Sequence, residues 1–113
     1  MRATAQRNAD LPMPTRHAEI NAIEQACATL KTLDLAGCVL YTTCEPCPMC
    51  FTAAHWAGLD RIVFGATIAD AHAAGFRQLH VDNHTLKHTG GSHVELTGPF
   101  MREACIELLQ ARS

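Results

Sequence analysis

The apolar residues are distributed so that helices alternate with short strands along the chain. The pattern predicts helices at 17–33, 48–58, 68–74 and 99–111, and strands at 39–42, 61–66 and 93–96. In the first helix, apolar residues recur at spacings of three and four. They are Ile20, Ile23, Cys27 and Leu30. Because strands that alternate with helices usually form a parallel sheet, we expect an α/β fold with a small, mostly parallel sheet.

Two segments lack such a pattern. Residues 1–15 are polar and carry Pro12 and Pro14, which predicts an irregular N-terminal arm ahead of a single domain at 16–113. Residues 76–92 are polar and rich in histidine, and Gly90 and Gly91 lie near their end. We expect this second segment to be mostly loop.

Composition and charge narrow the class of protein. With 48% hydrophobic and 18% charged residues, the 113-residue chain can bury a core. The formal charge is -2 and the basic residues are scattered, which argues against a nucleic-acid partner. The start of the chain has no apolar signal segment, and no apolar run approaches the roughly 18 residues of a membrane span. We therefore expect a cytoplasmic protein with reduced cysteines and no membrane association.

A candidate metal site joins the starts of two predicted helices. Cys47 and Cys50 flank the start of the helix at 48–58, where free N–H groups and the helix dipole favour thiolates. His17 opens the earlier helix, with Glu19 two residues on. Zinc binds one imidazole and two thiolates and keeps a fourth position for water in catalytic sites. The sequence predicts Zn²⁺ on His17, Cys47 and Cys50, with Glu19 carrying a proton from water to a substrate nitrogen.

Other interpretations of the cysteine cluster stay open at this point. Cys44 could complete a closed structural zinc site if the turn folded back. Cys44, Cys47 and Cys50 also share the spacing of an iron–sulfur motif, although Ala54 stands where a ferredoxin has its next cysteine. The carboxylate of Glu45 could either stabilise the turn or contact a partner subunit.

The same residues resemble a known family. His17-Ala18-Glu19 followed by Pro46-Cys47-Pro-Met-Cys50 resembles the signature of the zinc deaminases in the cytidine deaminase superfamily. The resemblance extends over residues 17–76. The run Leu-Tyr-Thr-Thr-Cys-Glu-Pro-Cys-Pro-Met-Cys looks especially like bacterial guanine deaminases. Its Glu-Pro-Cys-x-Met-Cys part is also similar to tRNA adenosine deaminases and small cytosine deaminases.

The resemblance implies a function and roles for further residues. It implies a three-layer α/β/α deaminase fold and hydrolytic release of ammonia from a free nucleobase or nucleoside. Guanine is the first expectation, followed by cytosine, cytidine or adenosine. Glu19 would shuttle the proton, the backbone N–H of Cys47 would hold the attacking oxygen, and Ala18 and Trp56 would contact the base. A homodimer is expected from the habit of relatives and from an exposed edge of the sheet.

This sequence departs from the family pattern at its start. Family members carry a helix and a β-hairpin before the His-x-Glu helix, whereas sixteen residues precede His17 here. We expect this chain to lack those elements, which would leave the strand at 39–42 with an unpaired edge and the pocket open. Gln78 stands where guanine deaminases place an aspartate. The alternatives are therefore a zinc-stabilised, catalytically incomplete deaminase-fold protein and a tRNA adenosine deaminase-like enzyme.

Overall fold

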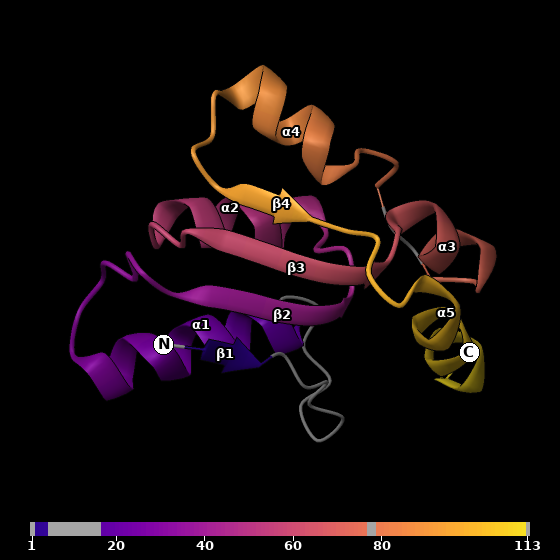
Figure 1. Ribbon diagram of the computed structural model, residues 1–113, viewed down its shortest axis with the longest axis horizontal. Coiled ribbons are helices and arrows are strands. Elements are labelled where there is room, and N and C mark those ends of the chain that lie inside the picture. Colours follow the sequence, from indigo (N-terminus) through magenta and orange to yellow (C-terminus); the bar gives the residue numbers. More distant parts are fainter. Residues whose placement is uncertain (1, 5–16, 77–78, 113) are drawn as a thin grey trace.

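A computed structural model describes residues 2–4, 17–76 and 79–112 of the chain (Figure 1). Strands and helices alternate through most of this part of the chain. The elements are β1 (Arg2–Thr4), α1 (Ala18–Leu30), β2 (Val39–Cys44), α2 (Pro48–Trp56), β3 (Arg61–Ala66), α3 (Ile68–Ala73), α4 (Asn83–Gly90), β4 (Glu95–Thr97) and α5 (Arg102–Arg112).

The described strands form one sheet in the order β1-β2-β3-β4, and every neighbouring pair is parallel. The register places Leu40 of β2 opposite Ile62 of β3, which in turn lies opposite Leu96 of β4. The arrows in Figure 1 accordingly all point the same way. The predicted parallel α/β architecture is confirmed.

The edge of β2 is occupied, contrary to expectation. Arg2–Thr4, part of the predicted irregular arm, form β1 and pair with β2 from Val39 to Tyr41. A three-residue strand has no readable apolar alternation, and its conformation follows from the hydrogen bonds that β2 offers. The expected unpaired edge at 39–42 was therefore wrong. The rest of the expected arm, residues 1 and 5–15, lies outside the described residues.

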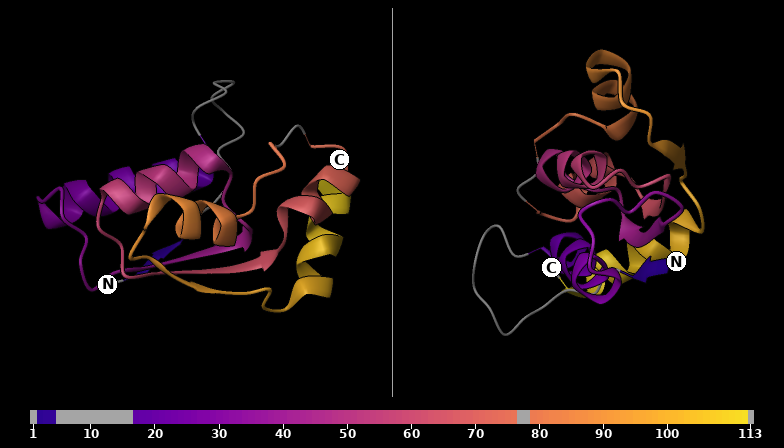
Figure 2. Two further views of the ribbon diagram at one scale, coloured as in Figure 1. Left: turned by 90° about the horizontal axis from the view of Figure 1, so that it is seen from above. Right: turned by 90° about the vertical axis from the view of Figure 1, so that its left-hand side faces the viewer.

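One face of the sheet is covered by α1 and α2, which run side by side (Figures 1 and 2). Side chains alternate along a strand, so Leu40 of β2 and Ile62 and Phe64 of β3 all point to this face. They meet Ile23 of α1 and Phe51 of α2 in the main apolar core. Leu40 and Ile62 are completely buried. Burial on this scale is the main stabilising contribution to the fold.

The opposite face carries a single helix at one end. An added Cβ on Gly65 of β3 would overlap the Sγ of Cys105, so α5 lies directly against that end of β3. Beyond α5 this face is more open, and Tyr41 is 39% exposed. The helices α1 and α2 thus form one layer on the sheet, and Figure 2 shows α5 at the end of the sheet, beside α3.

The histidine-rich segment contains a helix that the sequence pattern did not predict. α4 occupies Asn83–Gly90, within the segment expected to be mostly loop. The side chain of Asp82 caps its first turn by accepting the Thr85 N–H, and Gly91 ends it with a left-handed conformation (φ 69°). Most of α4 is polar, and only Asn83 is buried in it. The prediction of a loop was therefore wrong, because this helix is set by its caps and not by an apolar stripe.

Several other boundaries differ from the predicted ones, and two of them lie next to a residue with a positive φ. α1 ends at Leu30, where Lys31 adopts a left-handed conformation (φ 53°). The last helix begins at Arg102, three residues later than predicted, after Met101 with a positive φ of 53°. None of the helices in 2–4, 17–76 and 79–112 has the length and apolar character needed to cross a membrane.

Candidate metal centre

The two helices of the core face bring the predicted ligands together. His17 immediately precedes α1 in an extended conformation, and its carbonyl oxygen accepts the Asn21 N–H. Cys47 holds the same position before α2, which begins with Pro48, and Cys50 lies in the first turn. Proline suits this first helical position because its missing N–H has no intrahelical partner there. Both helices begin at the end of the sheet toward which the strand arrows point (Figure 1).

The distances in this cluster match a zinc site. The Nδ1 atom of His17 lies 3.5 Å from Cys47 Sγ and 3.6 Å from Cys50 Sγ. The three ligand atoms all lie within 4.8 Å of one another. Tetrahedral zinc with bonds of about 2.3 Å to sulfur and about 2.0 Å to nitrogen requires a nitrogen–sulfur separation of roughly 3.6 Å. The donor set and its spacing therefore fit Zn²⁺.

The electrostatics of the thiol pair also prepare it for a cation. The Cys50 thiol donates a hydrogen bond that lowers the pKa of Cys47 to about 6, assisted by the Cys50 N–H and the His17 ring. The same hydrogen bond, together with burial and the Glu19 carboxylate, raises the pKa of Cys50. The thiol pair thus favours a thiolate at Cys47, the form that binds a cation, and metal binding would displace the proton of Cys50.

Glu19 lies beside this cluster on the first turn of α1. Its Oε1 accepts a hydrogen bond from the Thr42 hydroxyl at 3.2 Å, and its carboxylate is close enough to Cys50 to influence that thiol. Thr42 also donates to the carbonyl of Cys44 at 2.9 Å. Thr42 was not predicted from the sequence as a residue of the site. Its alternation with Leu40 on the core face of β2 could have indicated that it points toward α1.

The structure does not bring Cys44 into the cluster. Its Sγ lies 4.0 Å from the carbonyl oxygen of Thr67, and burial raises the pKa of this thiol to about 12. Among the described residues, the group of possible metal ligands at this site contains only His17, Cys47 and Cys50. A closed four-ligand zinc site and an iron–sulfur cluster both need a further protein ligand, so the described geometry favours a three-ligand site with an open position.

Comparison with known proteins decides the family. Residues 1–66 match the family model of the cytidine and deoxycytidylate deaminase zinc-binding region. This chain belongs to that family. The matched region contains the helix starts that carry His17, Cys47 and Cys50, and the resemblance stated from the sequence is confirmed.

Three individual deaminases show how far this chain is similar to known proteins. The guanine deaminase of Bacillus subtilis (strain 168) is 49% identical over 63 residues, which are 56% of this chain and 40% of that protein. The tRNA-specific adenosine deaminase of Haemophilus influenzae is 34% identical over 96 residues, 85% of this chain and 53% of that protein. A solved guanine deaminase from Nitrosomonas europaea superposes with a TM-score of 0.75 and 31% identity, covering 87% of this chain and 57% of that one. This chain thus spans about half the length of these relatives.

This deaminase-family chain has a buried carboxylate two residues before Cys47. Glu45 is 4% exposed, and its two oxygens accept the backbone N–H groups of Ile68 (2.9 Å) and Asn83 (2.7 Å). These residues begin α3 and α4, so one carboxylate satisfies the N-termini of two helices. This supports the structural interpretation of Glu45. The Asn83 side chain donates to the carbonyl of Pro46 at 2.7 Å.

The two residues expected to contact a base occupy different places relative to the cluster. Ala18 lies between His17 and Glu19 and is half-buried. Trp56 is 80% exposed at the far end of α2, about 12 Å along the helix from Pro48. The structure therefore places Ala18 beside the cluster and does not bring Trp56 to it. Gln78 lies outside the described residues.

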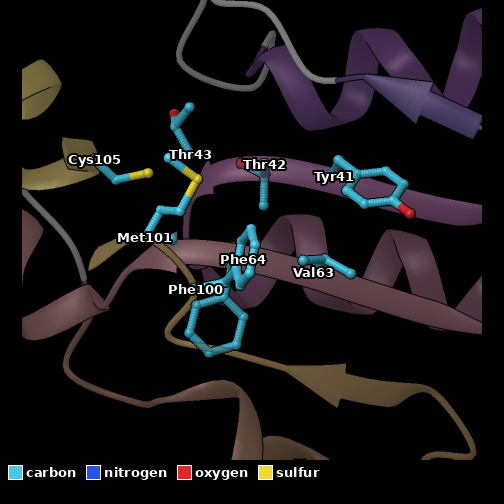
Figure 3. A pocket seen from close by; sticks show the side chains of 9 residues that line it. Tyr41, Thr42, Thr43, Val63, Phe64, Phe100, Met101 and Cys105 are labelled. Carbon is cyan, nitrogen blue, oxygen red and sulfur yellow. The ribbon is translucent and has the colours of Figure 1, made fainter. Parts of the chain in front are cut away.

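A cavity of about 200 Å³ lies elsewhere in the molecule. It is lined by Tyr41, Thr42, Thr43, Val63, Phe64, Gly65, Phe100, Met101 and Cys105. Figure 3 shows Tyr41 and Val63 at one end and Met101 and Cys105 at the other. None of the three candidate ligands lines this cavity, although Thr42, which donates to Glu19, does.

Proposed function

We propose that this chain carries the zinc centre of a hydrolytic aminohydrolase that acts on a nucleobase or nucleoside and releases ammonia. The observation that carries the proposal is the convergence of His17 Nδ1 and the thiols of Cys47 and Cys50 beside the Glu19 carboxylate. Three protein ligands leave a tetrahedral cation one position for an exchangeable molecule, which is typical of catalytic zinc sites.

Each residue of the centre then has a defined role. His17, Cys47 and Cys50 would hold the cation, and zinc bound there would supply a Lewis acid. Glu19 would take up a proton from the hydrolytic water and deliver it to the departing exocyclic nitrogen of the substrate. Thr42 holds one Glu19 oxygen through its hydroxyl. The backbone N–H of Cys47 precedes the first turn of α2 and stabilises negative charge on the attacking oxygen.

Guanine is the first substrate to test. The B. subtilis and N. europaea proteins named guanine deaminase support this choice, because they are 49% and 31% identical to the parts of this chain that they match. Ala18 is the residue best placed to lie against a base, since it separates a ligand from the proton carrier in sequence. The role of Trp56 stays a prediction.

A second candidate is adenosine in tRNA. The match to the H. influenzae tRNA-specific adenosine deaminase extends over 85% of this chain, compared with 56% for the B. subtilis guanine deaminase. The formal charge of -2 with scattered basic residues argues against this candidate, because tRNA binding favours a basic surface.

Ammonia release from guanine, cytosine, cytidine, adenosine and tRNA by the zinc-loaded protein tests the proposal. We expect turnover of at least one substrate, guanine first, and loss of that turnover in Glu19→Ala at unchanged zinc content. Intact activity in Glu19→Ala would contradict the mechanism. A zinc-loaded protein that is silent on all five would favour the catalytically incomplete alternative.

The expected homodimer and the cytoplasmic location stay predictions. β1 covers the edge of β2 that first suggested a dimer, so the habit of relatives is now the basis for that expectation. Analytical ultracentrifugation at micromolar concentration tests it, and a monomer there would count against it.

A further inference from the structure

We propose that Asn83 is a positioning residue for the candidate metal centre: it fixes the peptide group between Pro46 and Cys47. The inference rests on the proposed function, because that peptide carries both a metal ligand and the N–H assigned to the attacking oxygen. Asn83 begins α4, 36 residues after Cys47, and belongs to a segment whose pattern predicted only a loop.

The contacts of Asn83 are short and fully buried. Its side chain is 0% exposed, and its Nδ2 donates to the Pro46 carbonyl oxygen at 2.7 Å. The assignment of the amide is fixed by chemistry, since a carbonyl can only accept and Nδ2 must therefore face it. The Oδ1 atom has no hydrogen-bond partner among the described residues. The side chain thus forms one bond, and that bond is directed at the turn that carries Cys47.

Glu45 holds the asparagine in place. Its Oε2 accepts the Asn83 N–H at 2.7 Å, while its Oε1 accepts the Ile68 N–H at 2.9 Å. Its own backbone N–H donates to the Ala66 carbonyl at the end of β3. The backbone N–H of Asn83 therefore donates to Glu45, and its side chain donates to Pro46. Both bonds hold the same short turn.

The geometry of a peptide bond carries this restraint to Cys47. The six atoms of a trans peptide are coplanar, with the C=O and the N–H pointing in opposite directions. Gly98–Pro99 is the only cis peptide in the described residues, so the Pro46–Cys47 peptide is trans. Fixing the Pro46 oxygen therefore fixes the direction of the Cys47 N–H and the position of the Cys47 Cα. It restrains both the assigned oxyanion donor and the Sγ ligand.

The test compares Asn83→Ala with Asp82→Ala. Among the described residues, the Asp82 side chain caps α4 through the Thr85 N–H and has no hydrogen bond to the Pro46–Cys47 turn, so its loss weakens the same helix without releasing the peptide. Asn83→Leu is a second variant that keeps most of the side-chain volume and lacks the donor. Each variant is characterised by Tm, by kcat and KM for the substrate that the wild type turns over, and by zinc affinity in competition with a chromophoric chelator.

We expect Asn83→Ala or Asn83→Leu to lower kcat at saturating zinc, or zinc affinity, by about 10-fold relative to Asp82→Ala, with little change in KM. If the Asn83 variants that fold have the same kcat and the same zinc affinity as Asp82→Ala, Asn83 only supports α4. The inference is then overturned. If the wild type releases no ammonia from any substrate, the proposed function has failed, and the zinc competition still decides the role of Asn83.

Discussion

The hydroxyl of Thr42 donates a hydrogen bond to the Glu19 carboxylate at 3.2 Å and joins β2 to the first turn of α1. The same hydroxyl lies 2.9 Å from the carbonyl oxygen of Cys44. A hydroxyl has one hydrogen, so the two acceptors compete for it, and an ionised carboxylate is the stronger of them. Thr42 therefore holds Glu19 most firmly when Glu19 is ready to accept a proton.

Thr42→Val should therefore reduce turnover. The change keeps the shape of the side chain and removes its donor, and we expect kcat to fall roughly 10-fold, because a freed proton carrier spends less time in its working geometry. Thr42→Ser restores a hydroxyl and should recover most of the rate. Steady-state kinetics on the wild-type substrate measures both variants. A loss of turnover in Thr42→Ser with none in Thr42→Val would show that packing of the methyl group, and not the hydrogen bond, matters.

Zinc should stabilise the folded chain through the three candidate ligands. A ligand that binds only the folded state adds about 4 kcal/mol to the free energy of unfolding when its free concentration is about 1,000 times its dissociation constant. Thermal unfolding with zinc and with excess chelator should therefore give a higher Tm with the metal. Cys50→Ser should remove most of this difference. Cys27→Ser changes a cysteine that packs against the core outside the cluster, and the zinc-dependent difference should persist in it.

The elements with apolar periodicity could be predicted from the sequence, and the others could not. The strand at Arg61–Ala66 was predicted with its observed bounds, because its side chains alternate into a core that buries Ile62 and Phe64. α4 was missed because its start depends on Asp82 and on Glu45, which lies 38 residues earlier. β1 was missed because three residues acquire their conformation by pairing with β2. Asp82 before α4 and Gly91 after it were the available signals.

The residues of the candidate site also include some that the sequence predicts and some that it does not. His17, Glu19, Cys47 and Cys50 were identified because zinc chemistry requires those residue types at those spacings. Thr42 and Asn83 act through contacts with residues distant in sequence, and neither belongs to a local motif. Spacing therefore predicts the atoms that would bind the metal, whereas the groups that orient those atoms emerge only when the chain is folded.

Gly65→Ala should destabilise the packing of α5 against β3. An added Cβ would overlap Cys105 Sγ and lie 2.9 Å from the Thr43 carbonyl oxygen, so α5 would have to move away from β3. Overpacking of this kind costs about 1 to 3 kcal/mol. Gly90→Ala is the matched control, because nothing lies within 4 Å of its added Cβ and its φ is not positive. Urea unfolding should show a loss for Gly65→Ala and a neutral or slightly favourable effect for Gly90→Ala.

An ion pair between α3 and α5 should make stability depend on pH in the acid range. Arg102 donates from Nη2 and Nε to the two oxygens of Asp70 at 2.7 and 2.9 Å. The guanidinium, with a contribution from the Thr67 N–H, lowers the pKa of Asp70 from 3.8 to about 2. A depressed carboxyl pKa stabilises the fold fully above the unfolded value and loses that effect as the pH falls toward the folded value. The contribution should thus be constant above about pH 5 and disappear between about pH 4 and 2.

Asp70→Asn tests this dependence, because asparagine still accepts the Thr67 N–H but has no charge to pair with Arg102. We expect its Tm to lie roughly 1 to 5 °C below that of the wild type at pH 7, with the gap closing as the pH falls below 4. Glu103 is the matched control, since it is 88% exposed and lies 3.9 Å from Arg102. Glu103→Gln should follow the wild type throughout. A gap for Asp70→Asn that stays constant down to pH 2 would mean that the amide disrupts the α3 cap and that the ion pair contributes nothing.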